Sequence, residues 1–428
     1  MKIVQLTPGA GDSFYCENCL RDGALAAALR TIGHDAATVP LYLPLPTGEG
    51  SDKEVFFGGV NVFLQQKSAL FRKTPRWLDR LFDSPRLLRW AGKKSGMTSA
   101  REVGETLLSM LRGEHGRQVK ELDRLVDFLA THEKPDIVAL SNALLLGMVG
   151  RIKAALDVPV VCSLQDEKGY VDALDEPQRG QVWHVIRERA RDVDAFIAPS
   201  RFYRSAMQRR LELPDERFHV IPNAIDPDPF EPAEAPPSEP AVGYLSQMCR
   251  SKGLDTLAEA FILLKASGHH DELKLRVFGG MSGADVSFVE DVRRRVERAG
   301  VADDTEFSGD FAEEGKPAFL RSCSAVSVPT RQGEAFGLFL LEALACGVPV
   351  VLPEHGAFPE LVEATGGGIL CRANDPSALA QALESLLLDP RRAAELGRRG
   401  RQAVVGKFSL ERMAAEVAGV CERLAGLA

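Results

Sequence analysis

The feature that most limits how this chain can fold is a repeated alternation of short apolar runs with longer amphipathic stretches. The runs are rich in valine, isoleucine and leucine, and the stretches between them repeat their apolar residues at helical spacing. This alternation predicts βαβ units, in which helices cover both faces of a parallel sheet. The predicted strands are 2–6, 37–39, 60–64, 136–140, 158–163, 195–198 and 219–221, then 241–245, 273–278, 325–328, 348–352 and 368–371.

A proline-rich segment divides the alternation into two halves. Residues 226–240 read DPDPFEPAEAPPSEP, with six prolines in 15 residues. Proline is unfavourable in a helix interior and in a central strand, so a semi-rigid linker is predicted here. We expect an α/β protein with two doubly wound, Rossmann-like domains facing across a cleft. The expected parts are a domain at 1–225, the linker at 226–240, a domain at 241–407 and a final helix at 408–428 that crosses back to the N-terminal domain.

Composition excludes several classes of protein. The net charge of −8 argues against a nucleic-acid binder, which usually carries a basic domain. The first residues lack the apolar core of a signal peptide. The best apolar run, 339–352, is interrupted by Glu342 and falls short of the about 20 residues that span a bilayer. Eight cysteines are too sparse for a disulfide scaffold. We therefore expect a cytoplasmic enzyme.

The strongest motif is PTRQGEAFGL at 329–338, which leaves a predicted strand and enters a predicted helix. Its spacing places Glu334 in the loop and Glu342 inside the helix. Backbone N–H groups at the start of that helix form a ready anion site, and a loop carboxylate beside them can hold sugar hydroxyls. Glu342 lies in an otherwise apolar stretch, where a buried acid must have a partner.

A second loop with two glycines follows the first predicted strand. Gly9 and Gly11 permit a backbone to approach a ligand closely, although a plain tight turn explains them as well. Their spacing is not that of a dinucleotide fingerprint, because there is no third glycine and no acidic residue ends the second strand. NAD is therefore disfavoured as a cofactor.

The segment EAFGLFLLEALACGVPVV resembles the E-x7-E segment of the retaining glycosyltransferases of family 4, which have the GT-B fold. Further stretches resemble the family in its order along nearly the whole chain: PGAG, HVIPNAID, GYLSQMCRSKGLDTLAEAF, FSGDF and HGAFPELV. The resemblance implies transfer of a sugar from a UDP- or GDP-sugar to the hydroxyl of a glycan, lipid-linked or small-molecule acceptor, with no metal or other cofactor. It assigns the acceptor to the N-terminal domain and the nucleotide sugar to the C-terminal domain.

The resemblance also implies roles for single residues. Lys252, in the sequence SKG, matches the lysine that contacts the diphosphate. Glu334 matches the acid that holds donor-sugar hydroxyls through adjacent main chain, and Glu342 matches the acid that holds the nucleotide ribose. The remaining donor contacts implied are the main chain of Phe336, Gly337 and Leu338 and the first loop at Gly9 and Gly11.

The chain departs from the family pattern at two places. Gln247 stands where the family often has a diphosphate-binding arginine, and Arg250, three positions on, is the candidate replacement. Gln165 and Asp166 stand where many relatives have a histidine that contacts the donor sugar, and both are candidates to hold sugar hydroxyls.

These departures keep open a non-catalytic protein that binds or displays sugar nucleotides. A second alternative is a GT-B sugar-nucleotide epimerase, which would need acid/base groups that the sequence does not identify. Measuring sugar transfer alongside donor binding separates the enzyme from the first alternative. Product analysis with the donor alone separates it from the second.

The segment 70–94 stands out by its charge. It holds eight Lys or Arg and two Asp, a net charge of +6, interleaved with Trp77 and Trp90. Such a mixture suits a lipid head-group surface, so one interpretation is that the segment contributes to contact with the acceptor or with the inner face of the membrane. The alternative is that both tryptophans are core residues of helices whose outer faces are basic.

Overall fold

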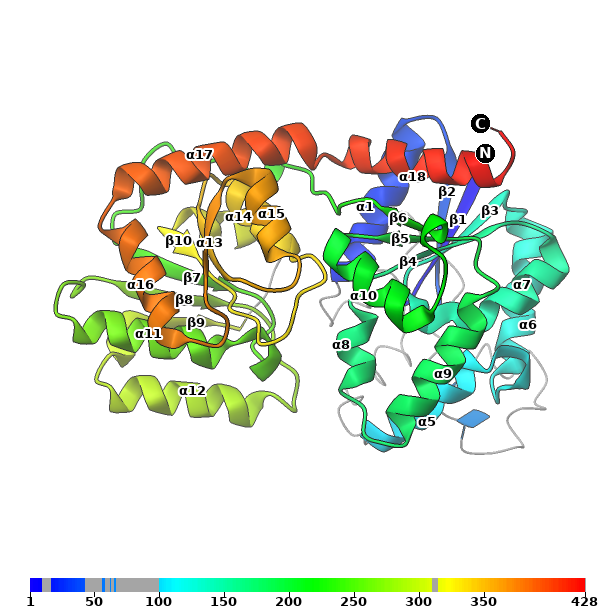
Figure 1. The fold of residues 1–428 in the computed structure, drawn as a ribbon, viewed down its shortest axis with the longest axis horizontal. Coiled ribbons are helices and arrows are strands. Elements are labelled where there is room, and N and C mark those ends of the chain that lie inside the picture. The colour runs from blue at the N-terminus through cyan, green and yellow to red at the C-terminus, as the bar shows by residue number, and fades with distance from the viewer. Residues whose placement is uncertain are drawn as a thin grey trace. The chain divides into compact units, whose positions relative to one another are not determined.

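A computed structural model describes residues 1–9, 17–42, 56–57, 62, 65–66, 100–309 and 315–427. The chain forms two compact units (Figure 1). Unit 1 comprises Met1–Pro222 together with Leu410–Ala428, and unit 2 comprises Asn223–Ser409. Three subjects of the sequence predictions lie outside the described residues: Gly11, the predicted strand 60–64 apart from residue 62, and the basic segment 70–94.

Unit 1 is built on a six-stranded sheet in which every neighbouring pair is parallel, in the order β2-β1-β3-β4-β5-β6. The strands β4 and β5 are buried at every position, as expected for a sheet with both faces covered. The strands are β1 (Lys2–Thr7), β2 (Asp35–Pro40), β3 (Ile137–Leu140), β4 (Val160–Ser163), β5 (Ala195–Ala198) and β6 (Phe218–Val220). The helices are α1 (Glu17–Thr31), α5 (Ala100–Leu111), α6 (Val119–Phe128), α7 (Val149–Leu156), α8 (Glu167–Asp172), α9 (Gln178–Ala190), α10 (Arg201–Leu211) and α18 (Leu410–Leu424).

Unit 2 repeats this plan with a second parallel sheet, in the order β12-β11-β10-β7-β8-β9. Its strands are β7 (Ala241–Leu245), β8 (Lys274–Phe278), β9 (Thr305–Ser308), β10 (Ala325–Val326), β11 (Val350–Pro353) and β12 (Gly368–Cys371). Its helices are α11 (Leu254–Ala266), α12 (Val286–Arg298), α13 (Lys316–Arg321), α14 (Leu338–Ala345), α15 (Phe358–Thr365), α16 (Pro376–Leu387) and α17 (Pro390–Lys407). The alternation of strands and helices therefore gives the two doubly wound sheets that the sequence predicts.

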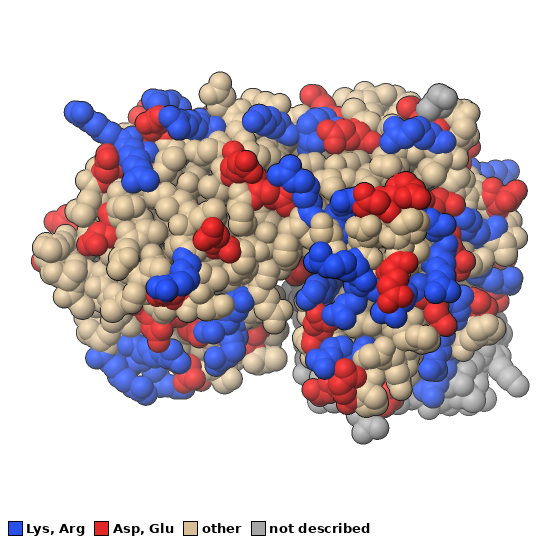
Figure 2. Space-filling view, viewed as in Figure 1, with Lys and Arg blue, Asp and Glu red and all other residues tan. Residues whose placement is uncertain are grey.

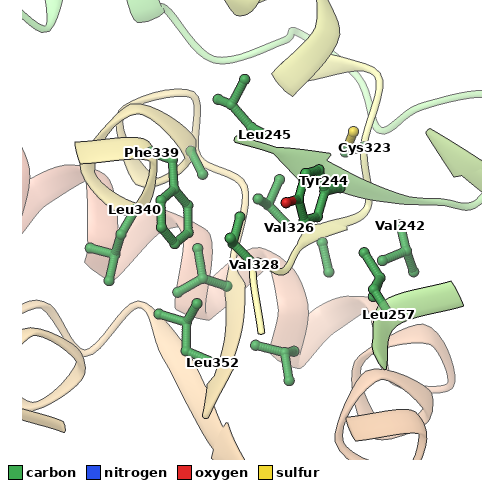
Figure 3. Close-up of a cluster of buried hydrophobic side chains, with 14 of the residues drawn as sticks. Val242, Tyr244, Leu245, Leu257, Cys323, Val326, Val328, Phe339, Leu340 and Leu352 are labelled. Carbon is green, nitrogen blue, oxygen red and sulfur yellow. The ribbon is translucent and has the colours of Figure 1, made fainter. Parts of the chain in front are cut away.

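The core of unit 2 lies between its central strands and the helices that cover them. Figure 3 shows Val242 and Tyr244 of β7 among side chains from β10, α11, α14 and β11. Helix α14 is buried from Phe339 to Ala345, so it runs through the interior of the unit. Burial of so much apolar surface fixes the start of α14 relative to the sheet.

The C-terminal helix α18 belongs to unit 1, where it packs against α1. Its buried stripe includes Met413, Val417 and Cys421, and Arg412 donates a hydrogen bond to the carbonyl of Pro222 at 2.9 Å. The expectation that this helix packs back on the N-terminal domain is thereby confirmed.

The proline-rich segment is attached to unit 2 at its start. Ile225 pairs with Ser409 in an isolated β-bridge, and Phe230 is buried in the core of unit 2. The compact units consequently divide after residues 222 and 409, whereas the sequence pattern predicts divisions after residues 225 and 407.

Charged side chains of both signs are interspersed over the faces of both units that Figure 2 shows. In the part of the chain that the structure describes, no helix has the length and apolarity to cross a bilayer.

The crossing of α17 over the end of α14 gives a prediction about stability. A Cβ atom on Gly397 of α17 would lie 1.8 Å from the carbonyl oxygen of Gly347, so Gly397→Ala must push the helix outward. We expect a cost of about 1–3 kcal/mol, which thermal unfolding would report as a lower midpoint. Gly406→Ala, in the same helix with nothing within 4 Å, should leave the midpoint unchanged or raise it. Equal midpoints for the two variants would contradict this packing.

Candidate functional site at the carboxyl end of the unit 2 sheet

Two loops lie together at one edge of the unit 2 sheet. Residues 246–253 follow β7, and residues 327–337 follow β10, which is the parallel neighbour of β7. Parallel neighbours end at the same edge, which is where doubly wound sheets bind ligands. The main chain joins the two loops, because the N–H of Arg331 donates to the carbonyl of Ser251 at 2.8 Å.

The two strongest sequence candidates form an ion pair across these loops. The Nζ of Lys252 lies 2.9 Å from Oε1 and 2.8 Å from Oε2 of Glu334, although the residues are 82 positions apart. The side chains keep 26% and 12% of their exposure, so the pair is partly shielded from water and still accessible. The structure therefore brings together a cation and a carboxylate that the sequence analysis assigned to the donor diphosphate and sugar.

A close backbone approach fixes the position of Lys252. The residue ends a short 3-10 turn, Arg250–Lys252, and the next residue, Gly253, has a φ of +73°. A Cβ atom on Gly253 would lie only 1.9 Å from the carbonyl oxygen of Pro329 in the second loop. Glycine is required here for both reasons, since other residues carry a Cβ and rarely adopt this φ.

The second loop leads into the N-terminus of α14. Gly337, with a φ of +95°, is the N-cap, and within the described ranges no side chain caps the helix. The N–H of Leu340 donates to the carbonyl of Gly337 at 3.1 Å, which leaves the N–H groups of Leu338 and Phe339 at the helix start as the candidates to face an anion. Phe336 is buried and holds the loop against the core, while Leu338 is half-buried. The predicted donor contacts Phe336, Gly337 and Leu338 thus surround one helix start.

Glu342 is buried and paired, as its apolar surroundings predict. It is the fifth residue of α14, and its Oε1 accepts a hydrogen bond from the Nζ of Lys316 at 2.8 Å. Lys316, the first residue of α13, is itself only 2% exposed. The apolar surroundings of Glu342 predict that it has a partner, but they do not point to Lys316, because 26 residues and a strand separate the two.

The cations around the first loop differ in their surroundings. Arg250 is 64% exposed; its guanidinium lies over the ring of Phe288 at 5.3 Å and 3.9 Å from Asp255. Gln247, at the position of the family arginine, donates its amide to Asp285 at 3.2 Å. Arg331, which the sequence analysis overlooked, pairs with the buried carboxylate of Asp255 at 2.6 Å. Arg331 could have been found from the sequence, because it lies in the PTRQGEAFGL motif, two residues after Pro329 and in the same loop as Glu334.

Several polar atoms at this edge are buried without a hydrogen-bond partner among the described residues. They are Oγ of Ser327, Oγ1 of Thr330, Nε of Arg331 and Nδ1 of His355. The other ring nitrogen of His355 lies 2.8 Å from the carbonyl of Thr330, and the carbonyl of Glu334 accepts from the N–H of Ala357 at 3.0 Å. Unpaired buried polar atoms are costly, and their grouping beside the Lys252–Glu334 pair is typical of a binding site.

Tyr244, on β7, holds the first loop by a hydrogen bond from its buried side chain. Burial raises the pKa of its phenol well above the ordinary value, so the hydroxyl stays protonated. It donates to the carbonyl of Gln247 at 2.7 Å, and this bond anchors the turn that follows β7.

The candidates in unit 1 lie at the corresponding edge of its own sheet. Gly9 follows β1 with a φ of +76°. Gln165 follows β4, and its amide donates to the carbonyl of Ser141 at 2.7 Å and to Asp22 at 3.3 Å. Asp166, with a φ of +64°, is the N-cap of α8. The amide of Gln165 is thus engaged within unit 1.

Asp22 of α1 is the centre of a polar cluster that the sequence analysis overlooked. The residue is fully buried and accepts hydrogen bonds from Thr7 at 3.1 Å and from Arg21 at 3.0 Å, as well as from Ser141. Arg21 also donates to Ser163 at 3.2 Å. The cluster therefore ties α1 to the ends of β1, β3 and β4.

Glu167 holds the neighbouring turn in unit 1. Its carboxylate accepts from the N–H groups of Ala143 and Gln165 at 2.8 and 2.9 Å and from the hydroxyl of Tyr203 at 2.8 Å. Burial raises the pKa of this carboxyl. Because the Glu167 carboxylate is buried and bonded to groups of unit 1, we assign it a role in stabilising the fold rather than in binding a substrate.

Among the described residues, no three His, Cys, Asp or Glu side chains are grouped as ligands of a metal ion.

Comparison with known proteins places the chain in a family. The family model described as Glycosyl transferases group 1 matches residues 227–403, and the model Glycosyltransferase Family 4 matches residues 99–229. The lipopolysaccharide core biosynthesis mannosyltransferase LpsB of Rhizobium meliloti is 32% identical over 248 residues, 55% of this chain and 67% of that protein. The chain belongs to glycosyltransferase family 4, whose members have the GT-B fold.

A second relative is also named as a mannosyltransferase. The GDP-mannose-dependent alpha-(1-6)-phosphatidylinositol monomannoside mannosyltransferase of Mycobacterium tuberculosis is 29% identical over 250 residues. That match covers 55% of this chain and 63% of the relative, so the chain spans less than two thirds of its length.

Solved structures share the whole fold. The sucrose-phosphate synthase of Thermosynechococcus elongatus superimposes with a TM-score of 0.74 at 19% identity, over the full length of both chains. HepE of Anabaena, solved in complex with UDP, gives a TM-score of 0.70 at 17% identity and covers 99% of this chain and all of the other. Both sheets thus have the Rossmann-like form of the GT-B fold.

The approach of Gly253 to Pro329 predicts a large effect from a single methyl group. Gly253→Ala should separate the two loops and displace Lys252 from Glu334, and binding of nucleoside diphosphates, measured by calorimetry, should fall at least ~10-fold. Gly268→Ala is the matched control, because its φ is +72° but nothing lies within 4 Å. If both variants weaken binding equally, backbone strain alone is responsible and the loop contact is unimportant.

Proposed function

We propose that this protein is a retaining, metal-independent glycosyltransferase that moves a sugar from a nucleotide-diphosphate sugar to an acceptor hydroxyl. The observation that carries the proposal is the Lys252–Glu334 pair, 2.8 Å across, which joins the loop after β7 to the loop that leads into the N-terminus of α14. A cation and a helix start suit a diphosphate, and a carboxylate beside them suits the hydroxyls of the attached sugar.

In the proposed reaction the bond between the anomeric carbon and the diphosphate oxygen breaks as the acceptor oxygen bonds to the same carbon. Negative charge grows on the leaving diphosphate, where Lys252 and the first N–H groups of α14 stabilise it. The acceptor approaches from the face that the diphosphate leaves, which retains the anomeric configuration. A diphosphate oxygen takes the acceptor proton, so no side chain is needed as nucleophile.

The unpaired buried atoms around the Lys252–Glu334 pair support a donor that makes further polar contacts. Arg331 Nε is a donor, and Thr330 Oγ1 and His355 Nδ1 can each donate or accept, depending on the rotamer or tautomer. A sugar diphosphate offers oxygen acceptors and hydroxyl donors to all three. Arg250, exposed at the same turn, is retained in the proposal as a second cation for the diphosphate.

The relatives guide the choice of substrates. One is named as GDP-mannose-dependent, and two are named mannosyltransferases of lipid-linked or lipopolysaccharide acceptors. We therefore propose GDP-mannose as the first donor to test, with UDP-sugars as the alternative, and a glycan or lipid-linked acceptor. Peripheral attachment to the inner face of the membrane through residues 70–94 remains a proposal that binding to anionic vesicles would test.

The cation arrangement predicts a ranking of variants. Lys252→Ala should lower the transfer rate by ~10²-fold or more, because it removes a partly shielded charge from the leaving diphosphate. Arg250→Ala should lower it less, since water screens a 64% exposed guanidinium. Arg298→Ala, an exposed arginine at the end of α12, serves as the control. Rates would be measured as sugar transferred from a radiolabelled donor, and wild-type rates in Lys252→Ala would refute the assignment.

A panel of nucleotide sugars tests the donor and the metal independence together. A donor at 100 times its Kd should add about 2.7 kcal/mol of apparent stability, visible as a rise in the unfolding temperature. GDP-mannose should give the largest rise, and EDTA should change neither the rise nor the transfer rate. Strict dependence on Mg²⁺ or Mn²⁺ would contradict the metal-independent mechanism. Binding without transfer to any acceptor would favour the non-catalytic alternative.

A further inference from the structure

The buried ion pair between Lys316 and Glu342 is the least expected contact of unit 2. Nζ of Lys316 lies 2.8 Å from Oε1 of Glu342, and the two side chains are only 2% and 10% exposed. Lysine is among the residues most rarely buried to this degree. Two apolar side chains would fill the same space without the loss of hydration that both charges incur.

Both partners are held on rigid supports. Glu342 lies in α14, where its neighbours Leu341 and Ala343 are completely buried. Lys316 begins α13, which is fastened to the sheet by the fully buried Leu320 and by Phe319, whose ring stacks on Phe278 at 5.0 Å. Neither end of the contact can shift without disturbing the core, so the direction of the carboxylate is fixed.

The pair lies beside the proposed diphosphate site. Glu342 is on the helix whose N-terminus is assigned to the diphosphate, little more than one turn from that end. In a nucleoside diphosphate the ribose is bonded directly to the phosphates. A carboxylate at this distance along the helix is therefore suitably placed to accept hydrogen bonds from ribose hydroxyls.

We propose that Lys316 is a positioning residue, which fixes the rotation of the Glu342 carboxylate for the ribose diol of the donor. The inference rests on the proposed function, because it deepens the role of the same site. Lys316 acts through Glu342, and no contact of its own with the donor is required. A hydrogen bond to a charged acceptor is about twice as strong as a neutral one, so a fixed carboxylate selects for the diol.

The test compares ribonucleotides with nucleotides that lack the diol. Calorimetry would give Kd values for GDP and UDP and for their 2′,3′-dideoxy forms, with wild-type protein and with Lys316→Met. We expect the wild type to prefer the better-bound ribonucleotide at least ~10-fold over its dideoxy form. Lys316→Met should reduce this preference several-fold while leaving dideoxynucleotide binding nearly unchanged, a pattern that a general loss of folding would not produce.

Two further variants establish the route of the effect. Glu342→Gln should reduce the preference as Lys316→Met does, and the double variant should reduce it no further, since the two act as a unit. Lys265→Met is the matched control. It removes an ion pair to Asp304, 2.7 Å long, with a lysine side chain that is only 9% exposed, and should leave the preference intact.

The outcomes separate the inference from the function on which it rests. If the wild type binds neither GDP nor UDP, the proposed function fails and the inference fails with it. If the wild type prefers the ribonucleotide and Lys316→Met keeps that preference, the positioning role is overturned while the function stands. Should Lys316→Met not fold, Lys316→Arg decides: it keeps the charge but changes the contact, so an unchanged preference overturns the proposal and an intermediate one supports it.

Discussion

Parallel pairing of β7 with β10 is the constraint on which the candidate site depends. The register joins Ala325 to Val242 and Val326 to Gly243, so both strands end at the same edge. Residues that are 82 positions apart then meet as the Lys252–Glu334 pair. Antiparallel pairing would have put the two loops at opposite edges, and the pair could not form.

Main-chain contacts hold this edge as firmly as side chains do. The N–H of Arg331 donates to the carbonyl of Ser251, and the N–H of Ala357 donates to the carbonyl of Glu334. Gly356 lies so close to the main chain of Glu334 that a Cβ atom on it would be only 2.5 Å from the nitrogen of Glu334. Such contacts do not depend on which side chains the loops carry. The position of the site is thus a property of the backbone, while its chemistry is left to a few residues.

Local pattern was sufficient to predict the two parallel sheets, the burial of Glu342 and its need for a partner. It also identified Lys252 and Glu334 as candidates through their family resemblance. It could not identify Lys316, Asp255 or the cluster around Asp22, because these contacts join segments that are distant in sequence and carry no periodic signal. Residues after β3 form a 3-10 turn, Ala143–Met148, before α7 begins, and the side chain of Asn142 accepts a hydrogen bond from the N–H of Leu144 at the start of that turn.

Three cations of unit 2 that surround the candidate site are paired with carboxylates. Lys252 pairs with Glu334, Arg331 with Asp255 and Lys316 with Glu342, each within 2.8 Å. On the proposed function, a diphosphate must share Lys252 with Glu334, which weakens its binding relative to a free lysine. The carboxylate of Glu334 can also accept a hydrogen bond from a hydroxyl of the donor sugar. An intact sugar nucleotide therefore regains binding free energy that a bare phosphate, which has no sugar, cannot regain. Pairing of this kind favours the complete donor over simple anions, which is specificity by differential contact.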